Sequence, residues 1–319
     1  MENLHLFEIP WIILLQQHSD WMLFLRGTSY LGAEVFYLVI PALFLGFNRR
    51  LGIRFVALFL LCNTVTNILK LAFHWPRPHW VDSRILSLAP IGSSYAMPSG
   101  HAVLSTALWL FLALEFRRKW SLPAALALAL AVCVSRVYLG VHFPSDVLMG
   151  ALTGLSLLVL FRRLWPRLEP VLESLTGTRV MLMSAAGSAV LLGSHALVIQ
   201  AIAGDPDLVS WKVDPILIRS MDTLTAGLLL GFGTGLGAAR GREWLRTPTT
   251  PHQRLLELLI GGACFAVLLL WLRDLLRNTA PLWAAWTEYP RTALAGFCVS
   301  FVAPWIGAVI KVPRAERDS

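Results

Sequence analysis

Long apolar stretches, separated by short polar segments, run along most of this chain. A transmembrane helix needs about 20 mostly apolar residues, and nine stretches approach or reach that length. The nine stretches are 30–47, 51–73, 101–116, 122–141, 146–161, 179–203, 220–239, 255–272 and 293–310. The pattern therefore predicts an all-α, polytopic integral membrane protein with about nine transmembrane helices.

The first 28 residues differ from these stretches because their apolar run is short. Residues 4–12 are mostly apolar, but polar side chains follow at 16–20. No Lys or Arg precedes the run and no A-x-A-like site follows it, so the segment does not resemble a cleaved signal peptide. We expect residues 1–28 to form an interfacial helix.

Lysine and arginine are concentrated in every second loop between the predicted spans. Such loops face the cytoplasm in membrane proteins. The asymmetry predicts an N-terminus on the outer side and a C-terminus in the cytoplasm, an arrangement that requires an odd number of spans. Nine spans satisfy it.

Composition agrees with a lipid environment. Of the 319 residues, 56% are hydrophobic and 14% are charged, whereas a soluble domain carries about 25% charged residues. The formal net charge of +8 is not gathered in the patch or stripe that a nucleic-acid-binding protein needs, so we expect no nucleic-acid partner. No linker or repeat divides the chain. We expect residues 1–167 to hold the interfacial helix and a catalytic membrane core, and 168–319 to add transmembrane helices to the same membrane domain.

Polar residues interrupt the apolar pattern in three clusters. Residues 70–78 (Lys-Leu-Ala-Phe-His-Trp-Pro-Arg-Pro) end the second span, and 98–101 (Pro-Ser-Gly-His) open the third. Residues 135–146 join the fourth and fifth spans. Because the spans alternate in direction, all three clusters emerge on the outer side, where we expect them to meet.

The cations in these clusters indicate an anionic ligand. A charged group costs roughly 2.5–3.5 kcal/mol at the centre of a membrane helix, so a compensating anion is expected. Lys70, Arg77 and Arg136 can bind phosphate oxygens, Arg through a fork and Lys as a point charge. We expect Ser99 to cap a helix whose free N–H groups favour an anion, and Gly100 lets a ligand approach the backbone. Pro76 and Pro78 break the helix after Lys70, so Arg77 should project from an extended segment.

Two histidines supply reactive groups beside these cations. Asp146 follows His142 by one helical turn, where its carboxylate can hold one ring nitrogen and leave the other free to attack phosphorus. We expect His142 to be the nucleophile and Asp146 to orient it. His101, at the facing helix start, is then the acid that protonates the leaving oxygen and later activates water on the phosphohistidine.

The same donors can stabilise five-coordinate phosphorus without a metal ion. Four acidic residues of the outer side, Asp82, Asp205, Asp207 and Asp214, are spread over separate loops without the spacing of metal ligands. We expect no metal and no other cofactor.

Together the clusters contain K-x6-RP, PSGH and SR-x5-H-x3-D, in that order. At these residues the sequence resembles the type 2 phosphatidic acid phosphatase superfamily. The resemblance implies a helical core shared with lipid phosphatases, diphosphate phosphatases and vanadium haloperoxidases. The implied roles are phosphate binding for Lys70, Arg77, Ser99, Gly100 and Arg136, general acid for His101, and a nucleophilic pair for His142 with Asp146.

Glucose-6-phosphatases offer a second likeness. Residues 77–81 (Arg-Pro-His-Trp-Val) look like their RPYWW stretch, and the nine-span layout and the outer loop at 211–215 are similar to theirs. This chain nevertheless keeps Asp146, as the lipid phosphatases do and the glucose-6-phosphatases do not. The departure favours a lipid substrate.

We therefore expect a phosphoric ester hydrolase whose site faces the periplasm, the exterior or an organelle lumen. Its expected substrate is a lipid phosphate or diphosphate, such as phosphatidate, phosphatidylglycerol phosphate or a polyprenyl diphosphate. A soluble sugar phosphate is the alternative substrate. A vanadate-dependent haloperoxidase and a non-enzymatic lipid or phosphate carrier or scaffold are the alternatives from other classes. The sequence does not indicate an oligomeric state.

Glycine recurs every four residues in the seventh span, at 227, 231 and 235. The Gly-x-Gly run of this span is not a dinucleotide loop, because such a loop follows a β-strand and no open strand lies inside a membrane span. Small residues at this spacing let two helices approach closely. We expect this face to pack against another helix.

Overall fold

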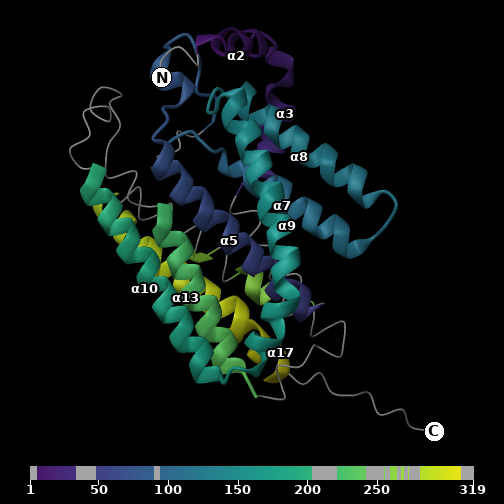
Figure 1. Cartoon of the computed structure of the whole chain (residues 1–319), viewed down its shortest axis with the longest axis vertical. Coiled ribbons are helices and arrows are strands. Elements are labelled where there is room, and N and C mark those ends of the chain that lie inside the picture. Colours follow the sequence, from purple (N-terminus) through teal and green to yellow (C-terminus); the bar gives the residue numbers. More distant parts are fainter. Residues whose placement is uncertain are drawn as a thin grey trace. The chain divides into compact units, whose positions relative to one another are not determined.

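The computed structural model describes residues 6–33, 48–89, 94–202, 221–241 and 281–309, with a few positions between 255 and 272. All regular structure in these ranges is helical, which confirms the all-α class (Figure 1). The elements are α2 (Ile9–Gln16), η1 (Ser19–Trp21), α3 (Met22–Tyr30), α5 (Arg49–Phe73), α6 (Pro78–Val81), α7 (Gly100–Phe116), α8 (Ser121–Tyr138), α9 (Pro144–Ser174), α10 (Gly177–Ile202), α13 (Met221–Ala239), α16 (Pro281–Phe297), η4 (Cys298–Val302) and α17 (Ala303–Val309).

The chain divides into two compact units. The first unit comprises Met1–Tyr37, Ala57–Arg167 and Ala196–Met221, and the second comprises Leu38–Val56, Leu168–His195 and Asp222–Ser319. Every residue that the sequence assigns to phosphate chemistry belongs to the first unit. The domain boundary expected after residue 167 stays a prediction.

Three described stretches are long and apolar enough to cross a membrane, and two further apolar helices are shorter. The long stretches are Arg49–Val81, Ser121–Tyr138 and Pro144–Ser174, and the shorter helices are Gly100–Phe116 and Thr223–Ala239. The predicted number of nine spans is not confirmed. The expected spans 30–47 and 255–272 lie mostly outside the described residues.

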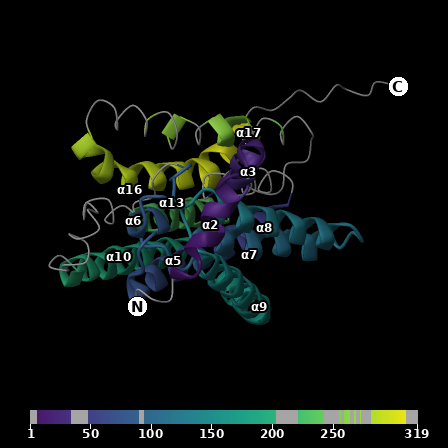
Figure 2. The ribbon, with the colours of Figure 1, turned by 90° about the horizontal axis from the view of Figure 1, so that it is seen from above.

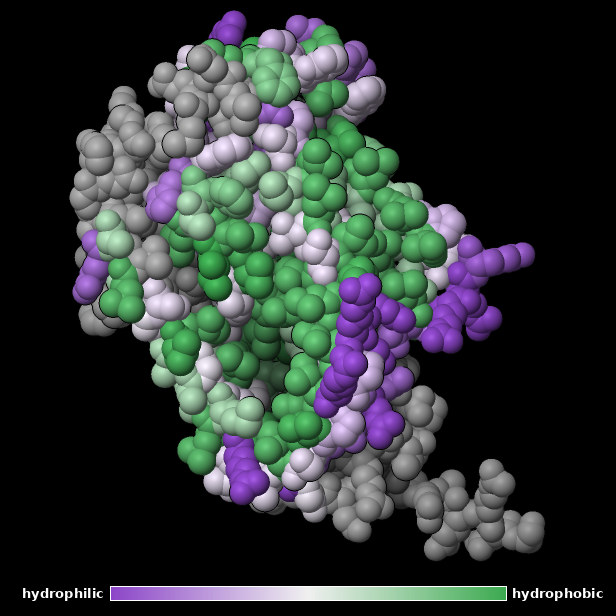
Figure 3. All heavy atoms as spheres, in the orientation of Figure 1, coloured by the Kyte–Doolittle hydropathy of each residue, from purple (hydrophilic) through white to green (hydrophobic). Residues whose placement is uncertain are grey.

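Hydrophobic side chains cover much of the visible surface, and hydrophilic ones gather in a few clusters (Figure 3). Leu126 and Leu130 of α8, and Leu148, Leu152 and Leu155 of α9, are all exposed. Leucine stripes on the outside of a helical unit are favourable in hydrocarbon and unfavourable in water. The two helices therefore present lipid-compatible faces.

The N-terminal segment differs from the single helix expected over residues 1–28. It forms α2 and α3, separated by the turn at Ser19–Trp21. The break has a physical cause in the polar stretch after α2: the Gln16 side-chain amide donates to the carbonyl oxygens of Leu86 (2.8 Å) and Tyr138 (3.0 Å). Ile9 and Ile12 of α2 are buried, so this segment packs into the first unit rather than lying beside it.

Helices α7 and α8 form an antiparallel pair in the first unit (Figure 1). Helix α9 packs closely on α7 because two glycines face it. A Cβ atom at Gly150 would lie 2.7 Å from the carbonyl oxygen of Ser99, and one at Gly154 would lie 2.4 Å from that of Val103. This close packing fixes the start of α7 against the start of α9.

Glycines also determine the packing of the second unit, where Figure 2 shows α13 between α10 and α16. A Cβ atom at Gly231 would lie 1.8 Å from the carbonyl oxygen of Ala293 in α16, and one at Gly227 would lie 2.5 Å from that of Tyr289. A Cβ atom at Gly235 would lie 2.0 Å from the hydroxyl of Ser300. The predicted helix-packing face at 227, 231 and 235 is confirmed.

Candidate active site

The end of α5 presents the first two cations. The helix ends at Phe73, before Pro76, and Arg77 has extended backbone angles (φ −83°, ψ 154°), as the flanking prolines predict. Lys70 lies in the last turn of α5 with 4% of its surface exposed, and its ammonium group donates to the carbonyl oxygens of Tyr95 and Ala96. Both cations are therefore held inside the protein.

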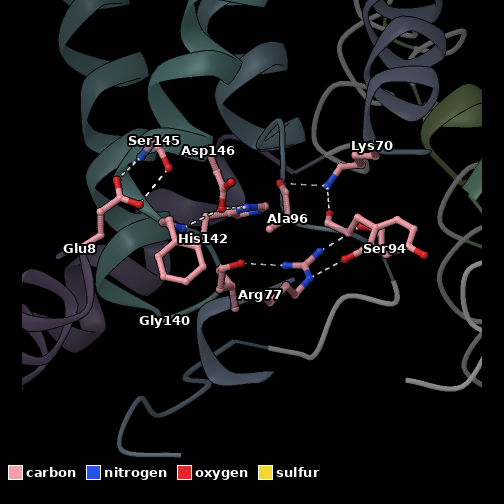
Figure 4. A network of polar contacts seen from close by, with 12 residues as sticks. Glu8, Lys70, Arg77, Ser94, Ala96, Gly140, His142, Ser145 and Asp146 are labelled. Carbon is pink, nitrogen blue, oxygen red and sulfur yellow. Dashed lines mark hydrogen bonds and ion pairs between the residues drawn. The ribbon is translucent and has the colours of Figure 1, made fainter. Parts of the chain in front are cut away.

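Arg77 joins two loops. Its Nε donates to the carbonyl oxygen of Ser94 (2.6 Å), and one terminal nitrogen donates to the Ser94 hydroxyl (3.0 Å). The other terminal nitrogen donates to the carbonyl oxygen of Val141 (3.0 Å), next to His142 (Figure 4). The residue is 3% exposed, and its guanidinium has more N–H groups than these bonds use, so donors remain for a ligand.

The third cation, Arg136, comes from the last turn of α8. One terminal nitrogen donates to the Ser29 hydroxyl of α3 (2.6 Å). Its Nε is buried and has no hydrogen-bond partner among the described residues. A buried donor without an acceptor destabilises the folded protein. An anion bound beside this nitrogen would supply the missing acceptor.

Ser99 stands directly before α7, as the sequence predicts. Its backbone N–H donates to the carbonyl oxygen of Asp146 (3.0 Å). Its hydroxyl does not cap the helix, which differs from our expectation; within the described residues this fully buried oxygen has no hydrogen-bond partner. A Cβ atom at Gly100 would make only an ordinary contact, 3.6 Å from Thr66. The role of Gly100 in ligand approach stays a prediction.

His101 is the second residue of α7, and its ring lies beside the end of α3. A Cβ atom at Gly32 would lie 3.4 Å from Cδ2 of this ring and 2.4 Å from Val132 of α8. Only a glycine fits at position 32 without moving its neighbours. The segment directly after α3 therefore packs against the His101 side chain.

His142 and Asp146 form the acid–imidazole pair that the sequence predicts. The Asp146 carboxylate accepts from the backbone N–H of Phe143 (2.8 Å), and the same oxygen lies 3.6 Å from Nδ1 of His142. Pro144 begins α9, as its restricted backbone favours. Gly140, with φ +68°, provides the turn before this pair, and a Cβ atom there would lie 2.3 Å from the carbonyl oxygen of Leu86.

The cations and the histidines act on one another. Burial, together with the positive charges of Arg77, Lys70 and Arg136, holds the pKa of His142 well below its ordinary value of 6.5. His101 lies close enough for its positive charge to lower the pKa of His142 as well. The structure thus brings the three predicted clusters together within the first unit.

Sequence reasoning missed three residues that shape this site: Glu8, Ser29 and Ser94. Each acts through a hydrogen bond to a residue of the site or to a loop that carries one. Two of them lie in the N-terminal segment, far from the clusters along the chain. The one available signal was Glu8, a single carboxylate within an apolar run.

The described residues contain no group of three or more His, Cys, Asp or Glu side chains that could hold a metal ion. Asp205, Asp207 and Asp214 lie outside the described residues, as does the 211–215 loop. The expectation of a metal-free site therefore stays a prediction.

Family comparisons match most of the chain in two pieces. Residues 51–170 match the PAP2 superfamily, the type 2 phosphatidic acid phosphatases. Residues 223–317 match a second description, PAP2 superfamily phosphatase, transmembrane extension. The first match contains all eight predicted site residues. The N-terminal segment with Glu8, Gln16 and Ser29 precedes it.

Curated relatives with different substrates are similar to this chain. Sphingosine-1-phosphate phosphatase 2 of Mus musculus is 30% identical over 45% of this chain and 42% of its own length. Undecaprenyl-diphosphatase of Sulfolobus acidocaldarius is 33% identical over 40% of this chain and 62% of its own length. Glucose-6-phosphatase catalytic subunit 1 of Haplochromis nubilus is 24% identical over 80% of this chain and 77% of its own length.

The chain spans between 34% and 42% of the length of the sphingosine-1-phosphate phosphatases that it matches. No solved structure matches it.

Proposed function

Because the chain belongs to the PAP2 superfamily, we propose that it is a membrane phosphatase that hydrolyses a phosphomonoester or diphosphate of a lipid through a phosphohistidine, without a metal ion. The observation that carries the proposal is the convergence of three buried cations on a histidine that pairs with a carboxylate. Lys70, Arg77 and Arg136 all act electrostatically on His142, and the Asp146 carboxylate lies 3.6 Å from its Nδ1. Buried positive charge beside a neutral imidazole suits an anionic electrophile.

The reaction proceeds in two steps. In the first, the ring nitrogen of His142 that faces away from Asp146 attacks phosphorus and forms a P–N bond. The bond from phosphorus to the leaving oxygen breaks, and protonated His101 gives its proton to that oxygen. In the second step, His101 removes a proton from water, the water oxygen attacks phosphorus, and the P–N bond breaks to release inorganic phosphate.

The cations and α7 stabilise the charge that develops on phosphorus. The free N–H of Arg136, the buried Ser99 hydroxyl and the first N–H groups of α7 are available as donors. Preorganised donors of this kind contribute about 3–4 kcal/mol each to similar reactions, judged from removal of one donor.

A lipid substrate is supported by the surface beside the site. Phe7, Trp11 and Leu14 of the N-terminal segment are exposed, although Glu8 and Ile12 of the same segment are buried. A helix whose exposed side is also apolar is more stable in contact with lipid than with water. A substrate could keep its chain in the bilayer while its head group reaches the cations. Two relatives are named for lipid substrates, sphingosine-1-phosphate and undecaprenyl diphosphate. The site would face the periplasm, the exterior or an organelle lumen, with the C-terminus in the cytoplasm.

A sugar phosphate is the second candidate substrate. It is favoured by the glucose-6-phosphatase relative, which covers 80% of this chain. Asp146 remains the residue that favours a lipid. A carrier or scaffold would bind phosphorylated compounds without releasing phosphate.

A phosphate-release screen separates these candidates. The purified protein in detergent is given phosphatidate, phosphatidylglycerol phosphate, a polyprenyl diphosphate and glucose 6-phosphate, each with and without chelator. We expect release from a lipid substrate, unaffected by chelator and lost in His142→Ala. Phosphate release from glucose 6-phosphate alone would identify a sugar phosphatase. No release from any substrate would favour a carrier. Loss of activity in the presence of chelator would contradict the metal-free mechanism.

A further inference from the structure

Glu8 reaches the catalytic turn from outside the family-matched region. Its side chain is buried, with 4% of the residue exposed, although it lies directly before α2 in an apolar segment. One carboxylate oxygen accepts from the backbone N–H of Ser145 (2.8 Å), and the other accepts from the Ser145 hydroxyl (2.9 Å). Figure 4 shows Glu8 and Ser145 on one side of the catalytic pair, with Lys70 on the other.

Ser145 lies between Pro144, which begins α9, and the catalytic Asp146. The backbone N–H groups of a helix's first turn have no partner within the helix, and the positive end of the helix dipole favours a carboxylate there. Glu8 supplies that carboxylate from another element. Asp146 meanwhile accepts from Phe143 and lies beside His142. Two carboxylates therefore fix the turn from 142 to 146 at successive points.

Packing around Glu8 makes its contact specific. Ile9 and Ile12 lie in one buried cluster with Phe143, which is part of the turn, and Val147, which follows it. The carboxylate is thus held against α9 by neighbours on both sides. Loss of this carboxylate would leave the Ser145 N–H buried without its acceptor, a change that favours movement of the turn.

We propose that Glu8 is a positioning residue that holds the first turn of α9, so that Asp146 keeps the His142 ring aligned for attack. This inference rests on the proposed function, because it assigns His142 the role of nucleophile. Glu8 does not touch the phosphate. It acts through Ser145 and the backbone that carries Asp146.

Glu8→Ala is expected to lower kcat by at least about tenfold and to leave KM within about twofold, because a small misplacement of a reacting group slows the reaction while the phosphate-binding cations remain in place. Glu8→Gln keeps an acceptor for the Ser145 N–H. It should recover most of the lost kcat, which also shows that the segment still folds.

Inhibitors give a second measurement on the same variants. Orthovanadate can bond to the attacking imidazole and imitate five-coordinate phosphorus, whereas inorganic phosphate needs only the cations. Glu8→Ala should weaken inhibition by vanadate at least about tenfold and leave inhibition by phosphate unchanged. Equal weakening of both inhibitors would contradict a positioning role and indicate that the phosphate-binding cations have moved.

Gln16→Ala is the matched control. Gln16 anchors the other end of α2 through three hydrogen bonds to Leu86 and Tyr138. This variant should lower Tm but change kcat by less than about twofold. A fall in kcat as large as that of Glu8→Ala would mean that α2 acts only as a structural support, and an unchanged kcat in Glu8→Ala would overturn the inference outright. A wild type that releases no phosphate would overturn the proposed function, and this inference with it.

Discussion

At the scale of single residues, Arg77 has two roles, of which the sequence predicts only one. The motif predicts a phosphate ligand, whereas the structure shows a side chain that also binds Ser94 and Val141. The RP motif indicates an extended backbone because proline restricts it. Hydrogen-bond partners 17 and 64 residues away leave no local pattern, so they could not be predicted.

Arg77→Lys tests this double task. Lysine keeps the charge but cannot reproduce the fork, so buried acceptors lose their donors at about 1–3 kcal/mol each. We expect a lower Tm and a fall in kcat/KM of at least about tenfold. Arg84→Lys is the control, because Arg84 forms an exposed ion pair with Asp82 (2.7 Å) and its replacement should change neither quantity. Wild-type stability in Arg77→Lys would show that the two loops do not depend on the fork.

His142 should make the stability of the folded protein depend on pH. Its pKa is lowered from 6.5 by burial and by nearby cations, so below about pH 6.5 the unfolded chain binds a proton that the folded protein does not. The free energy of unfolding must therefore fall as pH falls, by at most about 1.4 kcal/mol per pH unit for this one group. We expect the fall in Tm between pH 7.5 and 5 to be smaller in His142→Gln than in wild type. Identical slopes would contradict this account of the pKa.

At the scale of elements, glycine patterns were more informative than helix lengths. The four-residue spacing at 227, 231 and 235 predicted a packing face that α16 and η4 occupy. Gly150 and Gly154 of α9 have the same spacing and were not singled out, although they hold α9 against α7. The N-terminal segment was expected as one helix, and its break depends on Gln16 bonding to distant loops, which no local pattern shows.

Gly231→Ala should separate α13 from α16. Its Cβ atom would lie 1.8 Å from the carbonyl oxygen of Ala293, so the two helices must move apart, at a cost of about 1–3 kcal/mol or more. Thermal unfolding in detergent should show a lower Tm. Gly193→Ala in α10 meets nothing within 4 Å and should instead stabilise the protein by about 0.5–1 kcal/mol. Equal effects of the two changes would mean that the glycine face is not closely packed.

At the scale of the whole molecule, hydropathy predicted the all-α class and the membrane-compatible surface, and spacing predicted which residues meet. Lys70, Arg77 and Arg136 all act electrostatically on His142, so the residues that were expected to meet do so. The number of spans could not be confirmed, since two of the expected stretches lie mostly outside the described residues. The contribution of Glu8 and Ser29 to the site was missed because their hydrogen bonds join residues more than 100 positions apart.

A bound anion should stabilise the folded protein as a whole. A ligand that binds only the folded state adds about 2.7 kcal/mol at 100 times its Kd. We expect vanadate to raise Tm in wild type and to have a much smaller effect in Arg136→Ala, which lacks one of the converging cations. A full shift in Arg136→Ala would place the anion elsewhere.

In the described part of the chain, the hydrogen-bond acceptors of Arg77 are carbonyl and hydroxyl oxygens, which remain neutral at every working pH. Its charge is therefore preorganised before any ligand arrives, and it attracts free phosphate by the same force that attracts an esterified one. Charge alone gives little discrimination between substrate and product. Turnover would then slow as phosphate accumulates, and selectivity must come from the rest of the substrate.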